Sequence, residues 1–308
     1  MFEVREVRNE NYLLHHIDVH NNDISCKIFP NLGGSIQEFI YKGVQIIDGI
    51  SIDDDGIDNY FNTHKSALLF PFPNRVKDGN YSFNGKNYQL YLNEPQLNNS
   101  IHGLVFDKHF KIEKSNVTPN EAKISLSYTS DGLIKGYPFK FIFNIEYSIK
   151  IDGEIITTIE IQNIDKKKMP FGIGWHPYFT AQNLEHSTLS FDSNEHFIFS
   201  DRSIPENIVK SELPSKLIIG NRMFDDGFSL SKDHVKFDNP KYELNLKFGH
   251  NITPYLQIYT PSHRKNIAIE PMTCATDALN NKYGLLELEA DKAFQWVINL
   301  EVDLHDEA

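Results

Sequence analysis

The chain has 308 residues, of which 40% are hydrophobic, and its 42 acidic and 30 basic side chains give a formal net charge of −12. This is an ordinary globular composition, and the acidic excess argues against a nucleic-acid partner, which demands clustered Lys and Arg. Two cysteines, Cys26 and Cys274, cannot build a disulfide framework or a four-ligand zinc site, and neither a signal-peptide pattern nor a membrane-length apolar run stands out. We therefore expect a cytoplasmic protein with no membrane partner.

Alternation of apolar and polar residues with a period of two is the strongest pattern along the chain. It first predicts strands near 25–29 and 36–41, and then a hairpin over YSFNGKNYQL (81–90) that turns at Asn84-Gly85. Segments 139–150 and 154–162 alternate on either side of the turn signal Asp152-Gly153, and 294–300 alternates in the same way. Shorter strands are expected near 123–129, 188–191, 196–199, 242–248, 254–260 and 266–270.

Helical periodicity is scarce and is nowhere sustained for three turns, and no linker, low-complexity segment or internal repeat interrupts the strands. Many short strands at even spacing, with turn residues between them, indicate an all-β protein. The sequence therefore predicts one large antiparallel β-sandwich, a single domain over residues 1–308, with few short helices.

Two segments before residue 105 combine polar side chains with rigid or tightly turning backbone. FPFPNRV (70–76) presents Asn74 and Arg75 behind two prolines, and a guanidinium held in this way suits paired oxygens such as vicinal hydroxyls or a carboxylate. SIHGL (100–104) places His102 before a glycine, where a ligand can approach the backbone closely. Structural interpretations compete with both: Arg75 could pin a loop through a nearby Asp, and His102 could lie in a surface loop.

The segment GIGWHPYF (172–179) sets His176 within an apolar, aromatic stretch. Its glycines thin the strand and Pro177 ends the pairing, so we expect the imidazole at a strand terminus or bulge that faces a cleft. A core histidine whose hydrogen bonds are satisfied internally fits the segment equally well.

Carboxylates occupy two later segments. IAIEPMT (267–273) has Glu270 directly after an apolar strand and before a proline, where partial burial would raise its pKa toward that of a useful base. A structural salt bridge to an arginine would satisfy this pattern too. FDDGF (224–228) has Asp225 and Asp226 in a predicted turn.

Motifs of other catalytic classes are weaker. The sequence has no GxSxG elbow and no HExxH pair, and LGGS (32–35) does not open a helix after a βαβ strand. Cys274 has no motif that would support a nucleophilic role.

Taken together and in this order, the clusters resemble the aldose 1-epimerase (galactose mutarotase) family. The resemblance covers about residues 25–300 and is carried by PNRV with the downstream GNYSFNGKNYQL, IHG (101–103), HPYF (176–179), DDGF (225–228), LQIYTP (256–261) and IEPMTCATDALN (269–280). It implies a large antiparallel β-sandwich that interconverts the α and β anomers of a free aldose, such as galactose or glucose, with no metal or organic cofactor.

The family reaction opens a cyclic hemiacetal by removing a proton from the O1 hydroxyl and delivering one to the ring oxygen O5. The resemblance implies that Glu270 is the general base at O1 and His176 the general acid at O5. It also implies sugar-binding roles for Arg75, Asn74, His102, Asp225, Gln257 and Tyr178. The family spacing, an acidic residue three positions before a Phe, points to Asp225, although Asp226 stands beside it.

A monosaccharide is therefore the expected partner, and the oligomeric state stays open. EPMT followed by CATDALN resembles the less characterised branches of the family, which leaves the identity of the sugar open. A charged sugar, such as a hexose 6-phosphate or a sulfonated hexose, is one alternative and would call for further basic residues in the cleft, from Arg202, Arg222 or Arg264.

Two alternatives lie outside mutarotation. A carbohydrate-binding module or sugar sensor would keep the fold but would not need both Glu270 and His176. A glycoside hydrolase or lyase is the other, and hydrolases usually use two opposed carboxylates, for which Asp225 is the sole candidate partner of Glu270.

Overall fold

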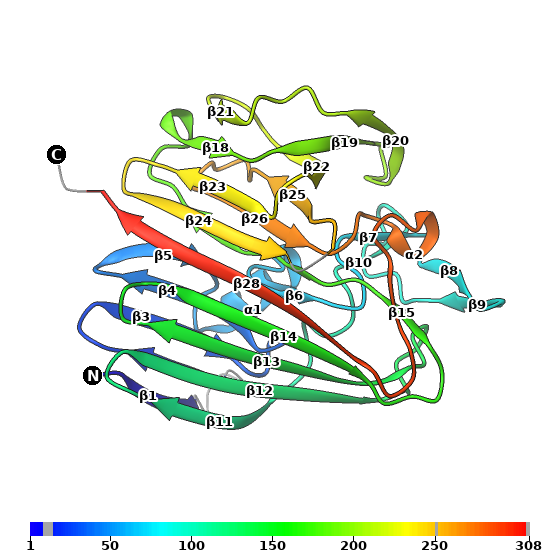
Figure 1. Ribbon diagram of the computed structural model, residues 1–308, viewed down its shortest axis with the longest axis horizontal. Helices are drawn as coiled ribbons and strands as arrows, with labels where there is room; N and C mark the ends of the chain where they lie inside the picture. Colours follow the sequence, from blue (N-terminus) through cyan, green and yellow to red (C-terminus); the bar gives the residue numbers. More distant parts are fainter. Residues whose placement is uncertain (9–14, 250–251, 306–308) are drawn as a thin grey trace.

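Two antiparallel β-sheets that share one hydrophobic core make up most of the molecule (Figure 1). The computed structural model describes residues 1–8, 15–249 and 252–305. The larger sheet has thirteen strands, hydrogen-bonded in the order β1 (Glu3–Arg8), β2 (His15–His20), β3 (Ile24–Phe29), β4 (Ser35–Tyr41), β5 (Val44–Asp48), β17 (Tyr178–Thr180), β26 (Asn266–Met272), β25 (Tyr255–Tyr259), β22 (Asp225–Leu230), β19 (Ser193–Phe199) and β20 (Pro205–Lys210), with β16 (Gly174–Trp175) joined to β26 and to β6 (Leu68–Leu69).

The smaller sheet has nine strands and covers one face of the core. Its order is β11 (Lys111–Val117), β12 (Glu121–Asp131), β13 (Lys140–Lys150), β14 (Ile155–Asn163), β28 (Ala293–Leu304), β24 (Tyr242–Gly249), β23 (His234–Asp238), β18 (Thr188–Ser190) and β21 (Lys216–Ile218). Three two-stranded pairs complete the strands: β10 (Asn99–Ile101) with β7 (Arg75–Lys77), β15 (Met169–Phe171) with β27 (Leu286–Leu288), and β8 (Asn80–Phe83) with β9 (Lys86–Gln89). The all-β, antiparallel fold class predicted from the sequence is confirmed.

The three longest alternating segments of the sequence form adjacent strands, β13, β14 and β28, of the nine-stranded sheet. Burial alternates along β14 residue by residue, as expected for a strand with one face on a core. Trp296 pairs with Ile159 across β28 and β14, and both side chains are completely buried. The other strands expected from the sequence each overlap a strand of the structure.

The predicted hairpin at 81–90 is confirmed as β8 and β9. Asn84 and Gly85 have φ values of 47° and 72°. Positive φ at both central residues is the geometry of a type I′ turn, which matches the twist of a two-residue hairpin.

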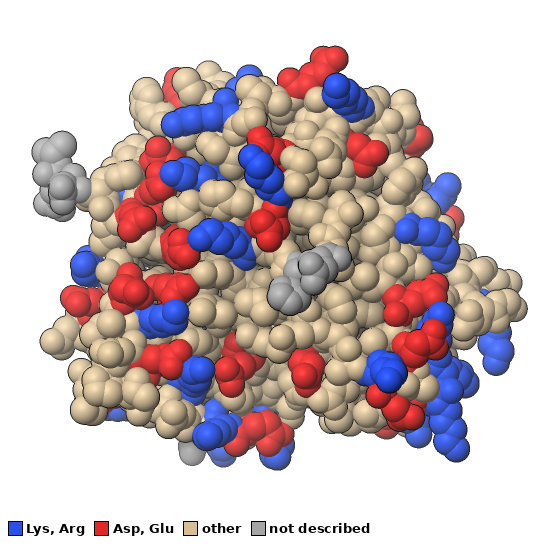
Figure 2. Space-filling view, viewed as in Figure 1, with Lys and Arg blue, Asp and Glu red and all other residues tan. Residues whose placement is uncertain are grey.

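The outer face of the nine-stranded sheet carries acidic and basic side chains side by side (Figure 2). Cross-strand ion pairs account for part of this mixing, among them Lys236–Glu243 at 2.7 Å and Lys247–Glu301 at 3.2 Å. The negative net charge is therefore interspersed with positive charge on this face.

Helix α1 (Asp54–Thr63) was not singled out by the sequence pattern. The carboxylate of Asp53 caps it by accepting a hydrogen bond from the backbone N–H of Gly56 at 2.8 Å. The helix ends at His64, which has a left-handed φ of 50° and donates its backbone N–H to the carbonyl of Tyr60. Tyr60 is completely buried, and its hydroxyl bonds to backbone carbonyls of two loops, which fixes α1 against the larger sheet.

The second helix, α2 (Ala278–Asn281), is a single turn. In the described parts of the chain, neither helix has the length and apolar character that crossing a membrane requires.

Strand β26 continues beyond residue 270, where the sequence predicts its end, and includes Pro271. The backbone N–H groups of Ile269 and Thr273 donate to carbonyls of the 172–177 segment. The backbone N–H groups of alternate strand residues point to the same side, so the nitrogen of Pro271, which carries no hydrogen, faces the same way as those of Ile269 and Thr273. It meets the interruption between β16 and β17, where no ladder hydrogen bond is lost. Glu270 therefore lies on a central strand and not at a strand end.

Candidate active site

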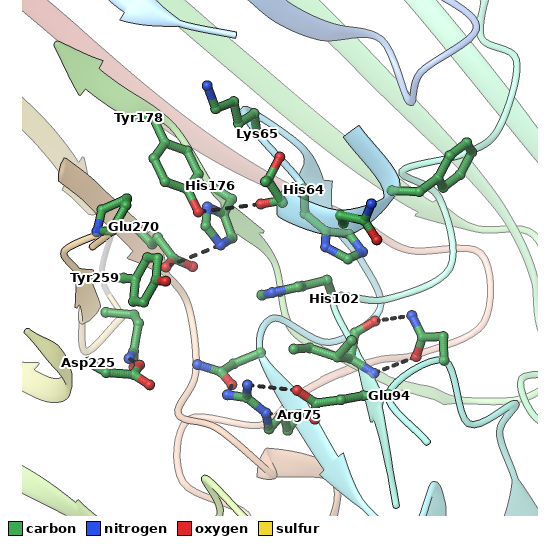
Figure 3. Close-up of a pocket in the computed structure, with 18 of the residues that line it drawn as sticks. His64, Lys65, Arg75, Glu94, His102, His176, Tyr178, Asp225, Tyr259 and Glu270 are labelled. Atoms are coloured by element: carbon green, nitrogen blue, oxygen red, sulfur yellow. Dashed lines mark hydrogen bonds and ion pairs between the residues drawn. The ribbon is translucent and has the colours of Figure 1, made fainter. Parts of the chain in front are cut away.

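A cleft of about 630 Å³ opens where the larger sheet meets the loops after α1, β6 and β10. All of the candidate residues from the sequence line it: Asn74, Arg75, His102, His176, Tyr178, Asp225, Gln257 and Glu270. Figure 3 labels all of them except Asn74 and Gln257. They come from segments up to 196 positions apart in the chain, between Asn74 and Glu270.

Glu270 and His176 form the buried floor of the cleft. The imidazole Nε2 lies 3.5 Å from Glu270 Oε1, and the two side chains are 7% and 2% exposed. Strand β26 fixes Glu270 opposite Gln257 of β25. His176 lies in the break between β16 and β17, where its backbone donates to the carbonyl of Ala67 and accepts from the N–H of Ser66.

Burial dominates the acid–base behaviour of this pair. It raises the pKa of Glu270 well above its usual value, with Asp225 adding repulsion and Arg75 opposing the shift. It also lowers the pKa of His176 to about 3, with His64 as the next contributor. Both shifts favour the uncharged forms, which are the protonated carboxyl of Glu270 and the neutral imidazole of His176. A protonated carboxyl beside a neutral imidazole gives the site an acid and a base at the same time.

Each member of the pair also has a polar atom without a hydrogen-bond partner among the described residues. These atoms are Glu270 Oε2 and His176 Nδ1, and both are buried. Buried polar atoms without partners are uncommon in folded proteins, because desolvation is not offset. The atoms are therefore candidates for contact with a bound polar ligand or with water.

Three histidines line one side of the cleft in a row (Figure 3). The ring of His102 lies edge-on to His176 with centroids 4.9 Å apart, and His64 lies 4.7 Å beyond His102. Tyr178 stacks on the other side of His176 at 5.1 Å. Burial lowers the pKa of His102 well below its usual value and that of His64 to about 4, so the row is uncharged at neutral pH.

Backbone geometry holds His102 in this row. It has a left-handed φ of 63°, and its N–H donates to the carbonyl of Asn74, which is itself left-handed with φ 54°. Gly103 follows with φ 77°, and a Cβ there would lie 2.4 Å from the carbonyl oxygen of Phe70. The glycine of the IHG motif is therefore required by a close backbone approach.

Arg75 lies at the start of β7 and bonds to Glu94 through two parallel contacts. Its Nε and Nη2 donate to the two carboxylate oxygens at 2.8 Å each, and its Nη1 donates to Asn74 Oδ1 at 3.2 Å. A guanidinium has five N–H donors, so one on Nη1 and one on Nη2 remain for a ligand. The structural interpretation of Arg75 thus holds in part, with a glutamate in place of the aspartate considered above.

Asp225 and Gln257 close the opposite wall. Gln257 Nε2 donates to Asp225 Oδ1 at 2.9 Å. Asp225 is exposed to the cleft, yet the protein around it removes enough water to raise its pKa. Asp226 is not among the lining residues and pairs instead with His196 at 2.8 Å, because adjacent residues of β22 point to opposite faces. Both aspartates lie in a strand and not in the predicted turn.

Sequence reasoning missed several lining residues, notably His64, Lys65, Glu94 and Tyr259. His64 and Lys65 follow α1, whose short amphipathic pattern gave no distinct signal. Glu94 lies in a loop without a motif, and only the fold brings it to Arg75. Lys65 is paired with Asp48 at 2.8 Å and lies over the Tyr178 ring at 5.8 Å.

Within residues 1–8, 15–249 and 252–305, no cluster of three or more His, Cys, Asp or Glu side chains is arranged to hold a metal ion. Both cysteines are buried and unpaired.

Comparison with known proteins relates the chain to sugar epimerases. Its fold matches that of a galactose mutarotase-like protein from Clostridium acetobutylicum, with a TM-score of 0.87, 19% identity and 99% of each chain covered. It also matches galactose 1-epimerase from Lactobacillus acidophilus NCFM, with a TM-score of 0.80, 16% identity, and 99% of this chain and all of that one covered. At such identities these structures establish the fold alone.

Sequence comparison extends the relationship. The uncharacterized protein YihR of Escherichia coli K12 is 26% identical over 283 residues, which are 87% of each chain. The family model described as aldose 1-epimerase matches residues 15–301. Because this match spans nearly the whole chain, the protein belongs to the aldose 1-epimerase family.

Proposed function

We propose that the protein is a mutarotase that interconverts the α and β anomers of a free, uncharged aldose such as galactose or glucose. The observation that carries the proposal is the buried pair of Glu270 and His176, whose Oε1 and Nε2 atoms lie 3.5 Å apart at the floor of an open cleft. Membership of the aldose 1-epimerase family supports the same reaction class.

The chemistry needs one group that accepts a proton and one that donates a proton. Glu270, as carboxylate, takes the proton of the O1 hydroxyl while His176, as imidazolium, gives its proton to O5, and the ring opens to the aldehyde. Transfer of the carboxyl proton to the imidazole across the pair prepares this state. Rotation about C1–C2 and the reverse transfers close the other anomer. Each proton-transfer group contributes about 10²–10⁴-fold to the rate.

The surrounding polar groups suit a sugar with several hydroxyls. The remaining donors of Arg75, the carboxylate of Asp225 and the free Oε1 of Gln257 supply both donors and acceptors around the cleft. Asn74 and Tyr178 hold Arg75 and His176 in place through a hydrogen bond and ring stacking. His102 offers its unpartnered Nδ1.

A charged sugar is less well supported. Among the described residues, the lysine and arginine side chains that line the cleft are ion-paired, Arg75 with Glu94 and Lys65 with Asp48. Arg202, Arg222 and Arg264, the arginines considered for a phosphate or sulfonate, do not line the cleft. An anionic sugar would therefore meet carboxylates without a free cation to offset them.

Polarimetry on fresh α-D-galactose and α-D-glucose tests the proposal, with Glu270→Gln and His176→Asn beside the wild type. We expect the wild type to speed the approach to anomeric equilibrium and each variant to lose about 10²–10⁴-fold of the catalysed rate while still binding sugar. A wild type inactive on both sugars would sink the proposal and leave a binding protein, and an active Glu270→Gln would remove Glu270 from its role.

Two matched substitutions on β22 compare a carboxylate that lines the cleft with a neighbouring carboxylate that does not. Asp225→Asn should mainly raise KM, since it removes a hydroxyl-binding group. Asp226→Asn changes the neighbouring carboxylate, which pairs with His196 outside the cleft, and should keep the wild-type rate. Equal effects of the two substitutions would contradict the placement of Asp225 at the sugar.

A further inference from the structure

Glu94 is a cleft residue that the proposed reaction leaves without a role. Its side chain is only 8% exposed, and Arg75, its partner, is 16% exposed. Its two oxygens accept from Arg75 Nε and Nη2 at 2.8 Å each, and Oε2 also accepts from Asn99 Nδ2 at 3.1 Å. Three N–H donors on one buried carboxylate make a rigid, charge-assisted contact.

The loop that carries Glu94 is itself fastened on both sides. The backbones of Glu94 and Asn99 exchange N–H···O bonds at 3.1 and 3.2 Å, which closes the loop. Arg202, from the distant turn after β19, donates to the carbonyl of Leu97 and to Asn99 Oδ1, and pairs with Asp78 at 2.8 Å. The carboxylate is thus held in place from behind, away from the cleft.

This arrangement has two consequences for a ligand. The Nε–Nη2 edge of the Arg75 guanidinium is bonded to Glu94, so the remaining N–H donors on Nη1 and Nη2 have a fixed direction (Figure 3). The carboxylate also offsets the positive charge of Arg75. Two opposite charges at hydrogen-bond distance largely cancel at longer range, so the pair acts on a third charge mainly as a dipole.

We propose that Glu94 is a positioning residue that determines specificity: it aims Arg75 at sugar hydroxyls and cancels its charge, so that the cleft takes uncharged aldoses and rejects those that carry a carboxylate, phosphate or sulfonate. The substrate class named here rests on the proposed mutarotase function. Removing the charge of Glu94 should turn Arg75 into an anion site.

The test compares dissociation constants from ligand-observed NMR titration at constant ionic strength. The ligands are D-galactose, D-galacturonate, which replaces the C6 alcohol by a carboxylate, and inorganic phosphate, which is small enough to reach Arg75 directly. For Glu94→Gln we expect the galacturonate-to-galactose ratio of dissociation constants to fall at least about ten-fold and phosphate to bind at least about ten-fold tighter.

Two further variants locate the effect. Glu243→Gln removes a carboxylate from an ion pair with Lys236 on the nine-stranded sheet, outside the cleft, and should leave the ratio unchanged. The double variant Glu94→Gln/Arg75→Gln should lose the phosphate site again. If Glu94→Gln does not fold, Glu94→Asp keeps the charge and withdraws it by one methylene; it should still exclude phosphate while lowering kcat/KM for galactose.

The outcomes are distinct. An equal loss of affinity for all three ligands in Glu94→Gln would leave Glu94 a loop anchor and overturn the inference, as would an equal shift in Glu243→Gln or tight phosphate binding by Glu94→Asp. A wild type that turns over neither galactose nor glucose overturns the proposed function instead. The phosphate titration needs no turnover and decides the role of Glu94 in either case.

Discussion

At the residue scale, burial sets the chemistry of this site more than charge pairing does. Desolvation is the first cause of the pKa shifts of Glu270, His176 and His102, and nearby charges only modify it. The effect raises the pKa of an acid and lowers that of a base, since both changes favour the uncharged form. The 3.5 Å distance between His176 Nε2 and Glu270 Oε1 places the two groups within reach of a direct proton exchange.

The pH profile of mutarotation follows from these shifts. An ordinary histidine gains a proton as the pH falls through 6.5, but His176, with a pKa lowered to about 3, stays neutral there. We expect kcat/KM, corrected for spontaneous mutarotation, to change less than about two-fold between roughly pH 7.5 and 5.5. An acid limb with its midpoint near 6.5, in protein that circular dichroism finds folded, would contradict this.

At the element scale, short irregular segments next to the strands set the orientation of several cleft side chains. His176 lies in the break between β16 and β17, and His102 lies in a left-handed turn after β10. Asn74 has the same left-handed geometry directly before β7. A break in pairing turns a side chain away from the regular alternation of a strand and toward the cleft.

Gly103 tests how tightly one of these turns is held. Gly103→Ala should destabilise the protein and weaken sugar binding, because the new Cβ would lie 2.4 Å from the Phe70 carbonyl oxygen beside His102. Gly85→Ala is the matched control: its φ of 72° is similar to the 77° of Gly103, but a Cβ there meets nothing within 4 Å. We expect the control to cost about 1 kcal/mol in urea unfolding, and Gly103→Ala to cost more.

Equal destabilisation by the two substitutions, with sugar affinity unchanged, would mean that the backbone at Gly103 yields without moving His102. The close approach would then not be what positions the histidine.

At the scale of the whole molecule, the two large sheets contribute differently to the cleft and to the core. Every described residue that lines the cleft comes from the larger sheet, from the β7–β10 pair, from α1 or from the connecting loops, and none comes from the nine-stranded sheet. The nine-stranded sheet contributes core side chains instead, such as Trp296, Phe141 and Phe143. Its stability and the activity of the cleft should therefore be separable.

Tyr147 offers a test of this separation. It is buried on β13, and its hydroxyl donates to the carbonyl of Gly34 at 2.8 Å, directly before β4 of the other sheet. Tyr147→Phe leaves that carbonyl unsatisfied and should cost about 1–3 kcal/mol in the free energy of unfolding, with kcat/KM unchanged. Tyr91→Phe, at a residue that is 71% exposed, is the control and should change neither quantity. A loss of activity in Tyr147→Phe without loss of stability would link the sheets functionally.

The sequence was most informative where local patterns suffice. Alternation with a period of two predicted β13, β14 and β28, because one face of each packs on the core. The Asn84-Gly85 dipeptide predicted its hairpin, because few other pairs adopt positive φ twice. The order of short motifs along the chain predicted the family and the set of residues that meet in the cleft.

Tertiary structure decided what depends on contacts between distant segments. Asp225 lines the cleft and Asp226 does not, because adjacent residues of β22 point to opposite faces of the sheet. Strand β26 continues past Pro271 because the missing backbone N–H faces a gap between two strands, and the packing of the loops brings Glu94 to Arg75. Tertiary structure also added His64, whose place at the end of α1 no local pattern marked. Sequence periodicity reports which face of an element is buried, but which partner that face meets depends on how the whole chain packs.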